Sequence, residues 1–119
     1  MQHRTLSGAG RRRKGIAAER ELARLLGVRR RYGQEAVGGP DLILHHNGHA
    51  ITIEVKRRST RPPLSEIERW MNGATIVALR VDRHPWEFCF RLPTFIPHAP
   101  EVLCTTTLEG LRALLGDHA

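Results

Sequence analysis

The alternation of apolar and polar residues between positions 40 and 56 predicts two β-strands joined by a tight turn. Residues 42–44 are all apolar, and in residues 50–56 isoleucine and valine alternate with threonine, glutamate and lysine. The Asn-Gly pair at positions 47–48 is a strong signal for a hairpin turn. Because alternate side chains of a strand share a face, Glu54 and Lys56 are expected to point away from the aliphatic side chains of their strand.

A helix is predicted over residues 15–27, because apolar residues recur there at helical spacing and end in a glycine. The apolar stripe consists of Ile16, Leu22, Ala23 and Leu26. Glu19 falls inside this stripe, whereas Arg20, Glu21 and Arg24 lie off it. A carboxylate on the packed side of a helix costs desolvation energy unless a cation meets it. Glu19 therefore either pairs with a basic residue at the rim of the core or belongs to an acidic site.

Further strands and helices are predicted along the rest of the chain. Residues 28–32 are predicted as a short basic edge strand, followed by a glycine-rich loop over 33–39. Capping-box patterns at 65–68 and 106–109 predict short helices that end near Met71 and Leu115, and residues 75–81 are typical of a buried strand. Residues 93–100 are expected to be irregular.

An aromatic strand is predicted over residues 86–92. Three aromatic residues and a leucine alternate on one of its faces, namely Trp86, Phe88, Phe90 and Leu92. Such clean alternation favours the protein core or a subunit contact over a platform on which nucleic-acid bases stack.

Length and composition indicate one globular domain with an anionic partner. The chain has 119 residues, 40% hydrophobic content and a formal net charge of +7. We expect a single domain over 1–119 with residues 1–10 as a flexible lead-in. The sequence contains no apolar run of membrane-spanning length and no signal-peptide pattern, so we expect a cytoplasmic protein without membrane contact, or one in the host cytoplasm if it is phage-encoded. Cys89 and Cys104 lack metal-ligand spacing and are expected to be reduced thiols.

Basic residues lie on both sides of the acidic positions. Ten of the 19 lysines and arginines fall within the first 31 positions, and more follow the second predicted strand. A run of this kind is often only a solvated face, but here the runs bracket Asp41 and Glu54, as a surface that binds nucleic-acid phosphates requires. The candidate DNA-binding residues are Arg11, Arg12, Arg13, Lys14, Arg20, Arg29, Arg30, Arg31, Arg57 and Arg58.

The predicted hairpin places Asp41, at the start of one strand, beside Glu54, near the end of the other. Two carboxylates with a nearby lysine suit hydrolysis of a phosphodiester, since Mg²⁺ prefers oxygen ligands and a lysine can orient water or phosphate. The simpler alternative is an exposed ion pair between Glu54 and Lys56, because the Glu-x-Lys pattern is common. Three histidines at the turn (His45, His46 and His49) lie at the far end and are interpreted as exposed turn residues.

Three segments together resemble the archaeal-type Holliday junction resolvase family of the PD-(D/E)xK nuclease superfamily. They are Lys-Gly-Ile-Ala-Ala-Glu-Arg-Glu-Leu at 14–22, Asp-Leu-Ile at 41–43 and Ile-Glu-Val-Lys at 53–56. The resemblance implies a restriction-endonuclease-like α/β fold, in which a mixed β-sheet is flanked by helices and the metal site lies at the sheet rim. It also implies a catalytic site of Glu19, Asp41, Glu54 and Lys56, with Mg²⁺ held by the acidic residues and the Val55 carbonyl.

The resemblance further implies that Arg20 contacts DNA and that a homodimer nicks opposed strands of a four-way junction. Mn²⁺ is expected to substitute for Mg²⁺, and no small-molecule cofactor is expected. The chain departs from the family in the spacing before Asp41 and in a shorter segment after Lys56. Two alternatives therefore stay open: a repair or restriction-type nuclease that acts on other DNA, and a basic DNA-binding module without catalysis.

Overall fold

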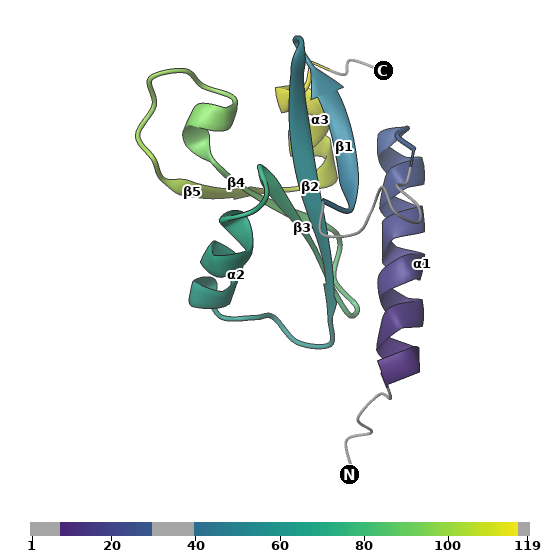
Figure 1. Cartoon of the computed structure of the whole chain (residues 1–119). Coiled ribbons are helices and arrows are strands. Elements are labelled where there is room, and N and C mark those ends of the chain that lie inside the picture. Colours follow the sequence, from purple (N-terminus) through teal and green to yellow (C-terminus); the bar gives the residue numbers. More distant parts are fainter. Residues whose placement is uncertain (1–7, 30–39, 117–119) are drawn as a thin grey trace.

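The computed structural model describes residues 8–29 and 40–116, which form a five-stranded mixed sheet with helices on both faces (Figure 1). The helices are α1 (Gly8–Leu26), α2 (Leu64–Met71), the short 3-10 helix η2 (Leu92–Thr94) and α3 (Leu108–Leu114). The strands are β1 (Leu42–His46), β2 (His49–Arg58), β3 (Ile76–Val81), β4 (Glu87–Arg91) and β5 (Leu103–Thr106). They lie in the order β1-β2-β3-β4-β5, with β2 and β3 parallel and the other neighbours antiparallel. The predicted mixed sheet flanked by helices is confirmed.

The β1–β2 hairpin turns through two residues, as the sequence predicts. Asn47 and Gly48 both have positive φ angles, 50° and 78°. Positive φ at both central residues belongs to the type I′ turn, whose twist matches that of the flanking strands. This turn fixes the register in which Leu42 pairs with Ile53. The register in turn determines which residues of β2 extend beyond the start of β1.

The two faces of the sheet are covered by different helices. One core contains Leu22 of α1 and Leu111 of α3 together with Phe88 of β4, all three completely buried. The other contains Ile67 of α2, which packs against residues of β3 and β4 such as Val77. Trp86, Phe88 and Phe90 all belong to the first core, so the predicted aromatic face is core and is not exposed for base stacking.

Helix α1 lies along the sheet beside β2 and ends in a glycine cap (Figure 1). Gly27 has a φ of 67°, and the Val28 amide donates to the Ala23 carbonyl at 2.9 Å. These are features of the Schellman motif, which satisfies carbonyls at a helix end. Arg112 of α3 also donates to the Leu25 carbonyl at 2.8 Å. The predicted end of this helix at Gly27 is confirmed, and its position against the sheet is fixed at that end.

Several predicted boundaries are wrong. Helix α1 begins at Gly8, so the last three residues of the predicted lead-in are helical. The N-cap of α2 is Pro63 and that of α3 is Thr107, whose hydroxyl accepts from the Gly110 amide at 3.0 Å. The observed N-caps therefore lie two residues before the predicted one at position 65 and one residue after the predicted one at position 106. Strand β5 was not predicted at all.

The predicted edge strand over 28–32 and the loop over 33–39 lie almost wholly outside the described residues. Val28 and Arg29, which are described, form no strand. Among the helices of the described ranges, none is long and apolar enough to cross a membrane.

Candidate active site at the edge of the sheet

The carboxylate of Asp41 is held at the point where β1 begins and β2 continues alone. Strand β1 starts at Leu42, so beyond Ile53 the backbone of β2 has no partner residue from β1. A part-buried amide needs an acceptor, and Asp41 Oδ2 accepts the Val55 N–H at 2.7 Å. In a strand the N–H and C=O of one residue point to the same side. The Val55 carbonyl is therefore directed to the same edge as Asp41.

Glu54 and Lys56 occupy the same face of β2 next to this edge. Asp41 precedes Leu42 and Glu54 follows Ile53, so the two acidic residues flank one pair of the hairpin register. Lys56 Nζ lies 3.3 Å from Glu54 Oε1, and their side chains are 22% and 28% exposed. The structure thus contains the Glu54–Lys56 ion pair that the simpler alternative predicts. It lies beside a third charged group, Asp41, rather than alone on a hairpin surface.

The environment of Asp41 favours its neutral form. The pKa of Asp41 is raised from 3.8 to about 6, mainly by burial and also by the negative charges of Glu54 and Glu19. The hydrogen bond from Val55 and the charge of Lys56 act in the opposite direction. A carboxyl group whose pKa is raised by burial and by other carboxylates is typical of a functional site, because a bound cation would relieve both effects.

Glu19, on α1, affects this site electrostatically, because its negative charge raises the pKa of Asp41. Its side chain is half-buried, and its effect on Asp41 places it within electrostatic range of the sheet edge. In residues 8–29 and 40–116, however, no three Asp, Glu, His or Cys side chains come close enough together to hold one metal ion. Asp41, Glu54 and the Val55 carbonyl could supply part of an oxygen ligand set, with water completing it, as is common for Mg²⁺. Glu19 as a metal ligand stays a prediction.

Glu21 lies on the packed side of α1, contrary to the prediction from the helical stripe. Its carboxylate accepts a hydrogen bond from Trp86 Nε1 at 3.1 Å. Ile16, which the stripe placed in the core, is instead 37% exposed, while Ala18 is buried. The packed face of α1 is therefore centred closer to Ala18 and Leu22 than the sequence indicated. Trp86 needs an acceptor for its ring N–H, and Glu21 supplies it.

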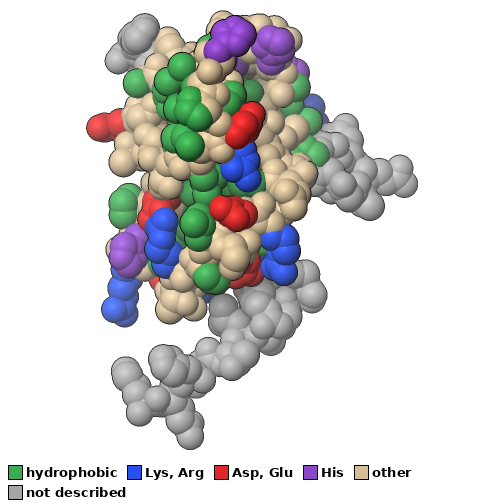
Figure 2. All heavy atoms as spheres, turned by 90° about the vertical axis from the view of Figure 1, so that its left-hand side faces the viewer, with side chains coloured by type: hydrophobic (Ala, Val, Ile, Leu, Met, Phe, Trp, Pro, Cys, Tyr) green, Lys and Arg blue, Asp and Glu red, His purple; other side chains and the backbone are tan. Residues whose placement is uncertain are grey.

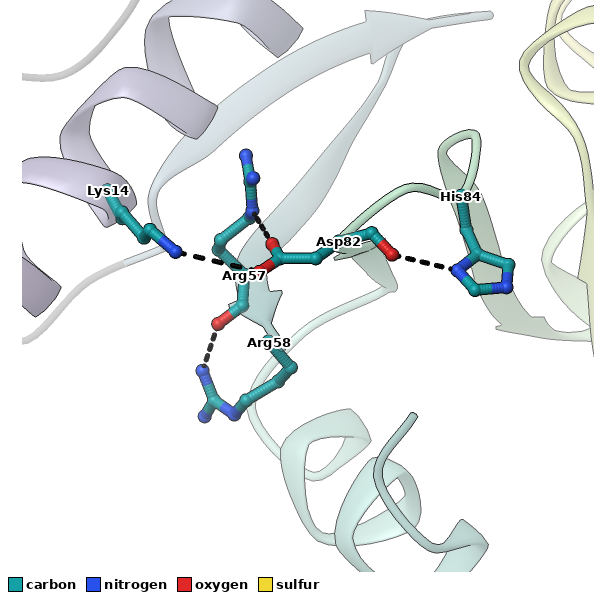
Figure 3. A network of polar contacts seen from close by, with 5 residues as sticks. All are labelled: Lys14, Arg57, Arg58, Asp82 and His84. Atoms are coloured by element: carbon teal, nitrogen blue, oxygen red, sulfur yellow. Dashed lines mark hydrogen bonds and ion pairs between the residues drawn. The ribbon is translucent and has the colours of Figure 1, made fainter. Parts of the chain in front are cut away.

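Two of the predicted DNA-binding cations belong to a network on the α1 side of the sheet (Figure 3). Arg57 Nε donates to Asp82 Oδ1 at 2.8 Å, and Lys14 Nζ lies 3.6 Å from Asp82 Oδ2. The hydrogen bond from Arg57, together with the charges of Arg57 and Lys14, lowers the pKa of Asp82. Asp82 thus holds two cations from separate elements, α1 and β2, next to each other. No pattern in the sequence singles out Asp82.

Arg58 points to the opposite face of the sheet from Arg57, because adjacent residues of a strand alternate. Its Nη1 donates to the Arg57 carbonyl at 2.8 Å, and its guanidinium lies over the ring of Trp70 in α2.

The structure describes the side chains of only some of the other candidate DNA-binding residues. Arg13, Arg20 and Arg29 are exposed, whereas the side chains of Arg11 and Arg12 and all of Arg30 and Arg31 lie outside the described residues.

Figure 2 views the face of the molecule that carries α2. Acidic and basic side chains lie close together near the middle of this face, interspersed with hydrophobic ones. Histidine side chains gather at the top of this view. His45 and His49 are exposed, and His46 pairs with His49 next to the β1–β2 turn. The histidines are therefore at the opposite end of the hairpin from Asp41, in agreement with their interpretation as turn residues.

Replacing Asp41 by asparagine is expected to stabilise the metal-free protein at neutral pH. A pKa raised to about 6 means that the folded state holds the proton more tightly, so the stability contributed by this group is present below pH 3.8 and is lost as the pH rises through 6. The shift corresponds to roughly 3 kcal/mol, which partial solvent exposure reduces to about 2 kcal/mol. Asparagine can still accept the Val55 N–H but carries no charge.

Urea unfolding of wild type and Asp41→Asn in EDTA, at pH 7.5 and at pH 4, measures this difference. The variant should be more stable at pH 7.5, and most of the gain should be absent at pH 4. An equal gain at both pH values would show that the charge of Asp41 is not its source.

Fold and site together define the class of the molecule: an α/β domain with a five-stranded mixed sheet, two acidic residues and a lysine at the sheet edge. Among solved structures, the chain is similar to Hjc, a Holliday junction resolvase from the archaeal hyperthermophile Archaeoglobus fulgidus. The two share 22% identity with a TM-score of 0.51, over 89% of this chain and 98% of that chain. The scan against protein-family models and the search of curated proteins give no match. The similarity to Hjc confirms the fold that the sequence resemblance implied.

Proposed function

We propose that this protein is a Mg²⁺-dependent endonuclease that cuts branched DNA, with the four-way junction as its preferred substrate. The observation that carries the proposal is the position of Asp41, Glu54 and Lys56 at one sheet edge, in a fold shared with a Holliday junction resolvase. The raised pKa of Asp41 supports it, because a carboxyl group buried among other carboxylates is suited to receive a cation.

The residues of the site have distinct roles in this proposal. Asp41, Glu54 and the Val55 carbonyl would hold the ion, with Glu19 completing the acidic surroundings. When bound, Mg²⁺ supplies a more acidic water and neutralises negative charge on the phosphate. Lys56 lies next to Glu54, where its ammonium can orient the attacking water or contact the scissile phosphate. The hydrogen bond from Val55 keeps the Asp41 carboxylate at the edge of the sheet.

The distribution of charge supports a DNA substrate. The net charge of +7 favours a polyanion, and the network around Asp82 places Lys14 and Arg57 side by side. Lysine and arginine side chains contact DNA mainly at its phosphates and do not read the base sequence there. DNA binding by this protein should therefore weaken steeply as the salt concentration rises. A homodimer would match the two-fold symmetry of a four-way junction and allow paired cuts.

A gel assay on a labelled four-way junction tests the proposal. Purified protein should produce paired, symmetrically placed nicks in the presence of Mg²⁺ or Mn²⁺ and none in EDTA. Binding without any metal-dependent cutting would contradict the nuclease function and would favour the non-catalytic DNA-binding module.

Duplex, flap and single-stranded DNA of the same sequence test the preference for junctions. We expect the junction to be cut at least tenfold faster than each of them, because a two-fold symmetric dimer would match the junction and not the other three substrates. Equal rates on all four would support a repair or restriction-type nuclease instead. The segment after Lys56 favours this alternative, because it is shorter here than in the archaeal-type resolvase family.

A further inference from the structure

Helix α2 brings one aromatic side chain to the charged face of β2. Glu54, Lys56 and Arg58 alternate along β2, so all three point to the face that α2 covers. The ring of Trp70 is half-buried there and packs at the border of the core formed around Ile67. Lys56 Nζ lies 5.1 Å from the ring centroid, and the guanidinium carbon of Arg58 lies 4.9 Å from it. Both distances are within the range of a cation–π interaction.

The ammonium of Lys56 therefore has two partners of different kinds. One is the Glu54 carboxylate at 3.3 Å, and the other is the Trp70 ring. A cation bound by Glu54 would compete with Lys56 for that carboxylate, whereas it would not compete for the ring. An aromatic ring also attracts an ammonium without neutralising it. The contact with Trp70 is thus the one that can hold Lys56 in place whether or not the acidic site is loaded.

We infer that Trp70 is a positioning residue of this site, whose ring holds the Lys56 ammonium and the Arg58 guanidinium beside Glu54, where they face a DNA phosphate. The inference rests on the proposed nuclease function and adds to it a residue from α2. Sequence reasoning could not find Trp70, because a tryptophan on a short amphipathic helix is ordinarily a packing residue.

Cleavage kinetics separate positioning from packing. Trp70→Leu should lower kcat about tenfold with little change in KM, a loss within the range that a missing cation–π contact explains. Trp70→Phe keeps an aromatic ring and should therefore retain most of the wild-type kcat. Met71→Ala is the matched control, because Met71 packs against the same core from the same helix and has no aromatic ring to attract either cation. It should cut like the wild type at a temperature where both proteins are folded. Equal losses in Trp70→Leu and Met71→Ala, or wild-type kcat in Trp70→Leu, would overturn the inference.

A second measurement does not depend on activity. The chain has only two lysines, Lys14 and Lys56, so protein labelled with ¹³C-lysine gives two sets of side-chain signals. The ring of Trp70 should shift the terminal methylene protons of Lys56 upfield relative to those of Lys14. This displacement should persist when Mg²⁺ is added and disappear in Trp70→Leu. Its absence from the wild type, or its loss on addition of Mg²⁺, would overturn the inference.

The cleavage kinetics and the NMR measurement together distinguish a failure of this inference from a failure of the proposed nuclease function. If the wild type cuts DNA but Lys56 shows no ring shift, Trp70 does not position the lysine and the nuclease function stands. If the wild type does not cut in any metal, the proposed function fails, and the NMR shift alone then decides whether Trp70 holds Lys56.

Discussion

Glu54→Gln is expected to reduce Mg²⁺-dependent cleavage of a four-way junction about 10³-fold, because in the proposed function it removes a charged metal ligand and with it several kcal/mol of transition-state stabilisation. Glutamine keeps the size and shape of the side chain, so β2 should pair with β1 and β3 as before. The variant also removes the carboxylate partner of Lys56. Rates are measured under single-turnover conditions with saturating protein.

Binding of the uncut junction provides the control for Glu54→Gln. Removing a negative charge from a face that is proposed to bind DNA should leave the affinity unchanged or make it tighter, so a variant that binds but does not cut has lost the chemical step. Glu66→Gln is the matched variant, because Glu66 lies on α2 and pairs only with the exposed Arg69 in the described part of the chain. It should cut at the wild-type rate. A Glu54→Gln protein that also cuts at this rate would exclude Glu54 from the metal site.

Lys56→Met is expected to lower kcat about 10²- to 10³-fold, the usual cost of removing a preorganised group that stabilises charge in a transition state. Methionine retains much of the apolar stem of lysine and can still pack against Trp70, so the folded structure should persist. KM should change little, because in the proposed function many other cations contact the phosphates of the substrate. The split between kcat and KM is measured on the labelled junction.

Arg69→Met is the control for loss of a single positive charge near this face, since Arg69 is well exposed and its described contact is with Glu66. It should cut normally. A Lys56→Met protein with more than a third of the wild-type kcat would show that the ion pair between Lys56 and Glu54 is only structural.

Local signals in the sequence were sufficient to predict the hairpin and most of the elements that surround it. The Asn-Gly pair at 47–48 specifies a two-residue turn, and that turn fixes which residues of β1 and β2 face each other. Asp41 and Glu54 could therefore be placed together from the turn and the strand pattern alone. Gly27 likewise marked the end of α1, because a positive φ at this position costs glycine little.

Contacts between distant segments could not be predicted in the same way. Strand β5 is four residues long and is defined by its pairing with β4, which no local pattern reveals. The same holds for Asp82, which lies 25 residues from Arg57 and yet accepts its hydrogen bond. The packed face of α1 was misplaced because the spacing of apolar residues ignores what the helix packs against. Glu21 shows this directly, since Trp86, 65 residues away, makes it part of the packed face.

Binding of Mn²⁺, followed by electron paramagnetic resonance, tests most directly whether the carboxylates at the sheet edge form a cation site. Wild type and Glu66→Gln should each take up Mn²⁺ in a saturable manner, and excess Mg²⁺ should displace it. Glu54→Gln and Asp41→Asn should lose most of this binding while remaining folded. Equal uptake by all four proteins would contradict the account, because the ion would then be bound away from Asp41 and Glu54.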